Sequence, residues 1–316
     1  MADRPVLVLT CLDDPTSDVV ITELCRRGIA VVRLDPGEFL AGRVELAARF
    51  GPGALSGRIR TPTRVLELDS VRSVYYRRPS PHAIPAGMDA QDGRFAVVQA
   101  RYGLDGVLAD LGCRYVNHPW NIMRADFKPA QLNAAAALGF QVSPTIVTNS
   151  LDEARRFAAE HGPVVYKPLR AVPFAVNGDR PAMVWVEVVE PSELDERIAL
   201  TAHMFQARTL DKIADVRVTV VGERVFAVRI DSPCLDFRQD YEKVAYSRFD
   251  LPRPVADACR GYLSHFDLLF GAFDFGLRAD GTLDWYECDP AGQWHWLEEE
   301  TGLPMTSALA DLLEGE

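Results

Sequence analysis

Two stretches in the last third of the chain carry the alternation of apolar and polar residues that is typical of antiparallel strands. The first covers residues 215–231 and is interrupted by the turn Gly222-Glu223. The second consists of residues 271–278 and 282–288, joined by Asp280-Gly281, a pair that strongly favours a tight hairpin turn. Because such turns place neighbouring strands in one sheet, we expect this part of the chain to be antiparallel.

Three acidic residues, Asp274, Glu287 and Asp289, lie on or just after the strands of the second hairpin. Carboxylates brought this close repel one another unless a cation neutralises them. Mg²⁺ takes hard oxygen ligands and is commonly shared between a few carboxylates and nucleotide phosphates. The alternative is a solvated acidic turn, but the aromatic neighbours favour partial burial; these are Phe273, Phe275, Trp285 and Tyr286.

Basic residues on predicted strands are candidate ligands for phosphate. Arg217 and Arg229 lie on the two arms of the first hairpin, and we expect them to face the same side. An arginine offers a planar fork that suits phosphate oxygens. Lys167 ends an apolar strand, and Lys128 precedes an alanine-rich helix. Taken alone, either arginine is equally well explained as a solvent-facing residue. Lys167 could instead be the exposed tip of its strand, and a lysine such as Lys128 is most often an ordinary surface residue.

The first part of the chain reads as a β-α-β unit. A strand at residues 5–10 is followed by a helix that begins at Asp14-Pro15 and ends at Gly28, and by a strand at 29–34. No glycine occurs between Cys11 and Pro15, which argues against a dinucleotide-binding loop. A second module starts near Asn117, and Ser192-x-x-Asp195 predicts a further helix within it.

Composition and charge limit the function. The net charge of −11 argues against a nucleic-acid-binding or membrane-surface protein, since both need a basic face. No apolar run is long enough to cross a bilayer, and no signal peptide is recognised. The six cysteines form no CxxC pair and no zinc-site spacing, so we expect a cytoplasmic protein with reduced thiols.

An ordered set of short motifs resembles the ATP-grasp superfamily, with the closer similarity to the ATP-grasp ribosomal peptide maturases, the graspetide synthetases, including those of actinobacteria. The resemblance covers essentially the whole chain. The motifs are Asn117-His118-Pro119, Lys128, Tyr166-Lys167-Pro168, Phe205-Gln206, Asp215-Val216-Arg217, Arg229, Asp274-Phe275-Gly276 and Glu287-Cys288-Asp289-Pro290-Ala291-Gly292-Gln293-Trp294. Tyr75-Tyr76-Arg77-Arg78-Pro79 and the Gly292-Gln293-Trp294 ending separate this group from other ATP-grasp enzymes.

The resemblance implies an ATP-grasp fold of the α/β and α+β classes in three parts. These are an α/β pre-ATP-grasp domain at residues 1–116, a central lobe at 117–204 and a C-terminal lobe with the magnesium site at 205–316. The nucleotide would lie between the two lobes.

The resemblance also implies roles for individual residues. Lys128 and Lys167 would bind the nucleotide phosphates. The backbone at Phe205-Gln206 would read adenine, with Asp211 and Lys212 near the ribose. Arg217 and Arg229 would stabilise the transferring phosphoryl group. Asp274, Glu287 and Asp289 would hold Mg²⁺; relatives commonly have asparagine at the last position, and aspartate is an equally hard ligand.

The implied activity is ATP-dependent ligation. A substrate Asp or Glu carboxylate would become an acyl phosphate, which a hydroxyl or amine of the same precursor peptide would attack to close a macrocycle. We favour an ester to Ser or Thr over an amide to Lys, on the resemblance alone. The leader of the precursor would dock on the enzyme, and a homodimer is left open.

Arg77 and Arg78 are expected to help hold an acidic core peptide; the alternative is that they are ordinary residues at a strand end. Two rival functions also remain at this stage. One is an amino-acid ligase of the glutamate-ligase type that acts on a small molecule or a protein tail. The other is a non-catalytic module that binds a nucleotide or a peptide.

Overall fold

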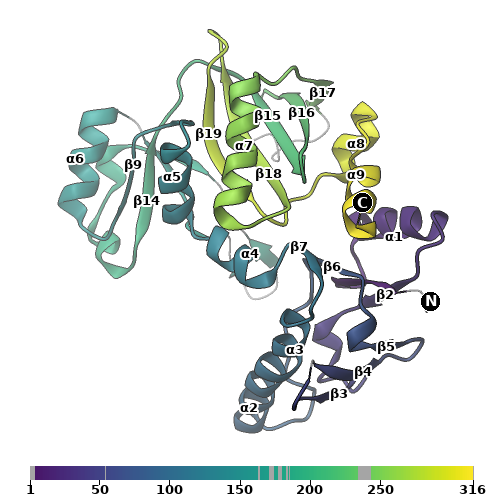
Figure 1. Cartoon of the computed structure of the whole chain (residues 1–316). Coiled ribbons are helices and arrows are strands. Elements are labelled where there is room, and N and C mark those ends of the chain that lie inside the picture. The colour runs from purple at the N-terminus through teal and green to yellow at the C-terminus, as the bar shows by residue number, and fades with distance from the viewer. Residues whose placement is uncertain are drawn as a thin grey trace.

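The computed structural model describes residues 4–53, 55–162, 164–170, 174–176, 180–182, 184, 186–233 and 243–315. Within them the chain forms a parallel sheet at its N-terminal end, a small antiparallel sheet in the middle and a large sheet at its C-terminal end (Figure 1). The predicted combination of α/β and α+β architecture is confirmed.

The N-terminal sheet is parallel and has the strand order β2-β1-β6-β7. Its strands are β1 (Val6–Thr10), β2 (Val31–Leu34), β6 (Ser73–Arg78) and β7 (Arg114–Val116). Alternate residues of β1 point to opposite faces, and both sets are buried, as is usual for parallel sheets. Val6 and Val8 pack with α1 (Pro15–Arg26) and α9 (Met305–Glu314), so the predicted β-α-β opening is confirmed.

The second face of this sheet is covered by a small antiparallel sheet and a helical segment. The sheet consists of β3 (Glu45–Arg49), β4 (Ser56–Arg60) and β5 (Val65–Glu67). The helical segment is α2 (Ala90–Ala100), the π-helical turn η3 (Arg101–Asp105) and α3 (Gly106–Ala109). Leu7 and Leu9 of β1 meet Leu104 and Leu108 of this segment in one hydrophobic core.

The small middle sheet is antiparallel and has the order β13-β10-β14-β9. Its strands are β9 (Thr145–Thr148), β10 (Val164–Lys167), β13 (Glu187–Val189) and β14 (His203–Ala207), with α6 (Leu151–His161) packed against them. β11 (Phe174–Val176) and β12 (Arg180–Ala182) form a separate pair. The predicted helix after Ser192 is wrong: two 3-10 turns, η4 (Pro191–Glu193) and η5 (Glu196–Leu200), occupy this stretch. The Asp195 side chain accepts a hydrogen bond from the Arg197 amide at 3.0 Å and so caps the start of η5.

The large sheet has the order β17-β16-β15-β18-β19-β8 and contains both predicted hairpins. Its strands are β8 (Gln141–Val142), β15 (Lys212–Val221), β16 (Arg224–Asp231), β17 (Ala245–Arg248), β18 (Phe270–Arg278) and β19 (Leu283–Asp289). One face packs against α5 (Lys128–Ala137) and α7 (Arg253–Phe266) through a core rich in aromatic side chains. The other face packs in part against α8 (His295–Thr301) and α9. α4 (Pro119–Ala125) leads from the N-terminal sheet into α5 (Figure 1).

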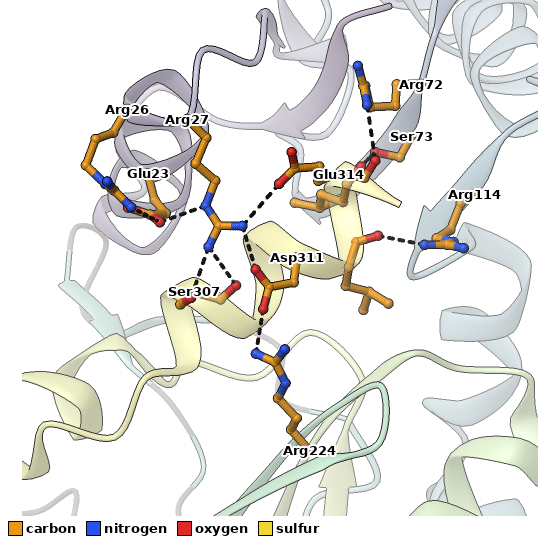
Figure 2. Close-up of polar contacts among 12 residues, drawn as sticks. Glu23, Arg26, Arg27, Arg72, Ser73, Arg114, Arg224, Ser307, Asp311 and Glu314 are labelled. Carbon is orange, nitrogen blue, oxygen red and sulfur yellow. Dashed lines mark hydrogen bonds and ion pairs between the residues drawn. The ribbon is translucent and has the colours of Figure 1, made fainter. Parts of the chain in front are cut away.

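The C-terminal helix α9 docks on the N-terminal sheet through a network of charged side chains (Figure 2). Arg27 lies at its centre and donates to Glu23 at 2.8 Å, Asp311 at 2.5 Å and Glu314 at 3.2 Å. Arg224 of β16 pairs with the other oxygen of Asp311 at 2.6 Å. The network therefore ties the N-terminal sheet to the large sheet through α9. Among the described residues, no helix has both the length and the apolar character needed to cross a bilayer.

Candidate active site

A row of three charged side chains crosses three neighbouring strands of the large sheet. The strand register places Arg217 of β15 opposite Asp274 of β18, and Asp274 opposite Glu287 of β19. Residues directly opposite one another in an antiparallel sheet project from the same face. Arg217 donates to both oxygens of Asp274, at 2.7 and 2.6 Å, and its residue is only 9% exposed. The row thus collects one cation and two carboxylates on one face.

Glu287, near the end of β19, lies on the same face as Arg217 and Asp274 because of a β-bulge at Tyr286. The register changes so that Asp274 lies opposite Glu287 while Phe275 lies opposite Trp285, which leaves Tyr286 as the extra residue. Trp285 and Cys288 can then both enter the aromatic core. The Tyr286 ring lies over Gly276, where any added Cβ would come within 2.0 Å of the tyrosine oxygen. Gly276 therefore supplies the space that this arrangement needs.

Two lysines reach the same strand from two other elements. Lys128, the first residue of α5, forms an ion pair with Glu287. Lys167, the last residue of β10 in the small sheet, places its ammonium group 4.5 Å from the centre of the Tyr286 ring. The predicted phosphate lysines and predicted metal ligands therefore meet at one place between the small and large sheets.

Asp289 continues the acidic strand into a turn. It is exposed, and its carboxylate accepts a hydrogen bond from the Ala291 amide at 2.8 Å. Asp289 and Glu287 also affect the charge of Arg217. Burial disfavours the charged guanidinium, but the negative charge of Asp274, and after it that of Asp289 and Glu287, raises the pKa of Arg217. All three predicted metal ligands therefore act on one buried cation.

The three acids are not gathered into a ready-made metal cage. In the part of the chain that the structure describes, no three His, Cys, Asp or Glu side chains lie close enough to hold a metal ion. Arg217 holds Asp274 and Lys128 holds Glu287, so a protein cation occupies each of the two facing carboxylates. Hard oxygen donors on one face, next to basic side chains that suit phosphate, fit a magnesium-nucleotide better than a metal alone.

The two predicted catalytic arginines do not share a face, which corrects the expectation from the sequence. The hairpin register places Val216 opposite Arg229 and Arg217 opposite Val228. Arg229 therefore projects with Val216 from the other face, and it pairs with Asp231 on its own strand at 2.7 to 3.0 Å. A two-residue turn at Gly222-Glu223 requires this register, so the error could have been avoided by counting along the hairpin.

The predicted adenine and ribose residues lie in and after the small sheet. Phe205 and Gln206 belong to β14, whose backbone is paired on one side with β10 and on the other with β9. Phe205 packs in the core of the small sheet, and Gln206 donates to Thr145 at 2.9 Å. Lys212 pairs with Asp215 at 2.9 Å, while Asp211 is more exposed and lies 3.7 Å from Arg278.

Arg77 and Arg78 are adjacent at the end of β6 and have different surroundings. Both line a cavity of about 740 Å³ between the N-terminal sheet and α4. Arg78 is exposed there, whereas Arg77 is 3% exposed and donates to the Ala291 carbonyl in the turn after Asp289. Asp126 also lines the cavity and is close enough to the acidic strand to respond to Asp289: burial, opposed by Arg170 and assisted by Asp289, raises the pKa of Asp126.

Several residues of the site carried no separate prediction. Tyr286 and Gly276 appear in the sequence only as neighbours of the acids, and no local pattern marks Asp126. The bulge and the interdomain contacts that involve them depend on register and docking, which no local pattern reports. Gly276 is the one residue that a local pattern could have indicated. It lies two residues after Asp274 within a predicted strand, where a glycine commonly marks a bulge or a close approach of another chain segment.

Comparison with known proteins shows what this chain is similar to as a whole. Residues 5–123 match the family model described as the MvdD pre-ATP grasp domain. A search of curated proteins finds no match. Among solved structures, the chain is similar to a RiPP-associated ATP-grasp ligase of Chryseobacterium gregarium, in complex with ADP and a leader and core peptide. That match has a TM-score of 0.89 and 26% identity, and covers 98% of this chain and 96% of the other.

Two macrocyclases of Microcystis aeruginosa MRC are also similar. MdnC, bound with the precursor peptide MdnA, has a TM-score of 0.87 and 26% identity and covers 98% of both chains. MdnB has a TM-score of 0.84 and 28% identity, over 99% of this chain and 100% of the other.

Proposed function

We propose that this chain, an ATP-grasp ligase whose residues 5–123 form a pre-ATP-grasp domain of the MvdD type, closes macrocycles in a ribosomally made precursor peptide. It activates Asp or Glu side chains as acyl phosphates with ATP and Mg²⁺ and joins them to Ser or Thr hydroxyls as esters, with amides to Lys as the second bond type. The observation that carries the proposal is the meeting of Lys128, Lys167 and the row Arg217–Asp274–Glu287 at one end of β19.

In the first step, a carboxylate oxygen of the peptide attacks the γ-phosphorus of ATP, the bond to the bridging oxygen breaks, and ADP leaves. Catalysis of such a transfer depends mainly on positioning and on neutralising phosphate charge. Lys128 and Lys167 bind the phosphates in this proposal, and Arg217 faces the transferring group. Asp274, Glu287 and Asp289 would hold Mg²⁺, which would neutralise further phosphate charge.

The ion pairs along this row support these roles. Asp274 and Glu287 lie directly opposite one another, an arrangement that is unfavourable for like charges. Lys128 neutralises Glu287, and Arg217 neutralises Asp274. Exchange of the Lys128–Glu287 pair for a magnesium-nucleotide would free the lysine for a phosphate and the carboxylate for the metal, so little charge is left unpaired in either state.

The nucleoside is proposed to lie along the end of β14 and the start of β15. Phe205 and Gln206 lie on β14, just before the segment that connects it to β15, and Asp211 and Lys212 lie near the ribose. Thr209, in this connection, donates to Asp284 at 2.6 Å, and Asp284 also accepts from Arg278, which stiffens this edge.

In the second step, a hydroxyl oxygen of the same peptide attacks the acyl carbon, inorganic phosphate leaves, and the hydroxyl proton leaves with it. Holding both groups on one chain makes this step effectively unimolecular. The cavity that Arg78 lines reaches Asp126, near the acidic strand, so we place the core peptide there with Arg78 facing its carboxylates. The leader docks elsewhere on the enzyme.

We also propose that the protein works in the cytoplasm and that its functional division is 1–116, 117–204 and 205–316. Residues 128–142 bridge the last two parts, since α5 packs in the core of the large sheet and β8 pairs with β19.

Incubation with ATP, Mg²⁺ and a candidate precursor, followed by mass spectrometry of the peptide, tests the function. The candidate is a short peptide encoded nearby, with a C-terminal region rich in threonine and acidic residues. We expect the loss of one water mass for each bond and the release of one ADP. ADP formation with an unchanged peptide mass would overturn the macrocyclase proposal and point to an amino-acid ligase. No ADP formation despite nucleotide binding would point to a non-catalytic module.

A further inference from the structure

The turn after the acidic strand, Pro290-Ala291-Gly292-Gln293, is held by residues from distant parts of the chain. Asn117 donates to the Pro290 carbonyl at 2.8 Å, Arg77 donates to the Ala291 carbonyl, and Thr16 donates to the Gln293 side chain at 2.5 Å. All three donors belong to residues 5–123, the pre-ATP-grasp part. The segment that immediately follows Asp289 is therefore held by this part of the chain, and two of the donors, Thr16 and Arg77, lie within the proposed domain 1–116.

The same turn lies directly on Arg217. Arg217 donates to the Gln293 carbonyl at 3.1 Å with its Nη2 group, while its Nη1 group donates to Asp274. A Cβ at Gly292 would come within 2.7 Å of Nη2 and within 2.6 Å of Ala272, so only glycine fits without displacement. A shift of the turn would consequently move both Asp289 and the Arg217 guanidinium.

Ala291 connects Arg77 with the Asp289 carboxylate. Its carbonyl accepts from Arg77, and its amide donates to one oxygen of Asp289. That hydrogen bond fixes the carboxylate and leaves the second oxygen available for a ligand. Second-sphere contacts of this kind orient metal ligands and tune the site.

Arg77 is poorly suited to a purely structural role. It is 3% exposed, and among the described residues its Nε and Nη2 groups have no hydrogen-bond partner. Burying a cation costs several kcal/mol, and an apolar side chain of similar length is commonly as stabilising or more so. The Arg77 charge acts on the buried carboxylate of Asp14: burial raises the pKa of Asp14, whereas hydrogen bonds from Ser17 and Thr10 and the charge of Arg77 lower it. Within the described part of the chain, the one hydrogen bond that Arg77 donates goes to the Ala291 carbonyl.

We propose that Arg77 is a positioning residue: through Ala291 it fixes the turn that orients Asp289 and Arg217, and so couples the N-terminal domain to the nucleotide-metal site. This inference rests on the proposed function of that site. It assigns Arg77 a task different from that of its neighbour Arg78, which faces the cavity.

The test compares Arg77→Met and Arg77→Lys with Arg64→Met, which removes an exposed arginine far from the site. For Arg77→Met we expect the Mg²⁺ concentration at half-saturation to rise about 10- to 100-fold, the usual range for a lost second-sphere partner. The maximal rate of ADP formation should fall, while the peptide KM stays within about twofold. Arg77→Lys should restore part of the Mg²⁺ affinity, since it keeps a donor, and Arg64→Met should match the wild type.

Binding of ADP as a function of Mg²⁺, measured without peptide, gives a readout that does not depend on macrocyclisation. If the wild type binds Mg²⁺-ADP but modifies no peptide, the proposed function fails while this measurement still tests Arg77. If Arg77→Met does not fold, Thr16→Val removes a contact to the same turn and should produce a smaller shift in the same direction. A raised peptide KM with unchanged Mg²⁺ dependence would show that Arg77 contacts the substrate directly and would overturn the proposal.

Discussion

Arginines lie at the centre of two charged clusters in this protein, and the two clusters differ in how fully those arginines are bonded. At the interface of α1 and α9, every nitrogen of Arg27 has a partner, supplied by Glu23, Asp311, Glu314 and Ser307 (Figure 2). At the acidic strand, the Nε group of Arg217 has no partner among the described residues, and Arg77 uses only one of its nitrogens. A saturated network is suited to holding elements together. An unsaturated one can accept a ligand or transmit its position.

The largest effect should come from Glu287→Gln, which tests whether the unsaturated cluster is a catalytic site. The amide keeps the size of the side chain but loses the charge that Lys128 neutralises and that the metal requires. We expect the rate of ADP formation with precursor peptide to fall by about a thousandfold or more. The affinity for the peptide, measured by fluorescence anisotropy, should stay unchanged. Glu223→Gln, in an exposed turn, should change neither quantity. Retention of ADP formation in Glu287→Gln would place the chemistry elsewhere.

Arg217→Met and Arg229→Met form a matched pair that tests the face of the sheet on which catalysis occurs. Arg217 lies in the row with Asp274, so its loss should reduce the maximal rate of ADP formation by about 10²- to 10³-fold. Arg229 projects from the other face and pairs with Asp231, so its loss should reduce that rate by at most about threefold, because it does not face the transferring group. Equal losses in steady-state assays would mean that Arg229 reaches the site from β16.

Much of the fold could be predicted from the sequence because its signals are local. The turns at Gly222-Glu223 and Asp280-Gly281, the proline at the start of α1 and the glycine after its end each act within a few residues, and each prediction is confirmed. The ordered motifs predict the ATP-grasp fold for a related reason: each motif lies on one element or at its end, and their order follows the topology.

The rest depended on long-range packing. Simple alternation along β19 would place Trp285 and Glu287 on the same face, whereas the bulge at Tyr286 places them on opposite faces. The bulge exists because Trp285 and Cys288 both enter one core. Likewise, nothing in Tyr75-Tyr76-Arg77-Arg78 distinguishes the buried arginine from the exposed one. Their difference arises when the turn at Ala291 docks on β6.

The saturated interface should respond to substitution in stability rather than in catalysis. Arg27→Met removes the common partner of three carboxylates, and its side chain is only 15% exposed. We expect the free energy of unfolding to fall by about 2 to 3 kcal/mol, because acceptors are left partly unpaired at the interface. Urea denaturation at pH 7 measures this change, with Arg156→Met, in an exposed pair of α6, as the control expected within about 0.5 kcal/mol. The ADP-forming rate per folded molecule should stay near that of the wild type, in contrast to Arg217→Met.

The smallest expected effect is a pH dependence that belongs to the same interface. Hydrogen bonds from Arg26 and Arg27 lower the pKa of Glu23 from 4.5 to about 2. Burial works against it, but hydrogen bonds from Arg27 and Arg224 also lower the pKa of Asp311. A carboxylate whose pKa is lower in the folded state binds fewer protons there, so its stabilisation is complete above the ordinary pKa and is lost as the pH falls toward the folded value. The free energy of unfolding should therefore decline from about pH 4.5 down to about pH 2. This decline should be shallower in Arg27→Met than in the wild type, because Glu23 and Asp311 then keep only Arg26 and Arg224. Parallel curves for the two proteins in urea titrations across this range would show that Arg27 contributes through packing and not through its charge.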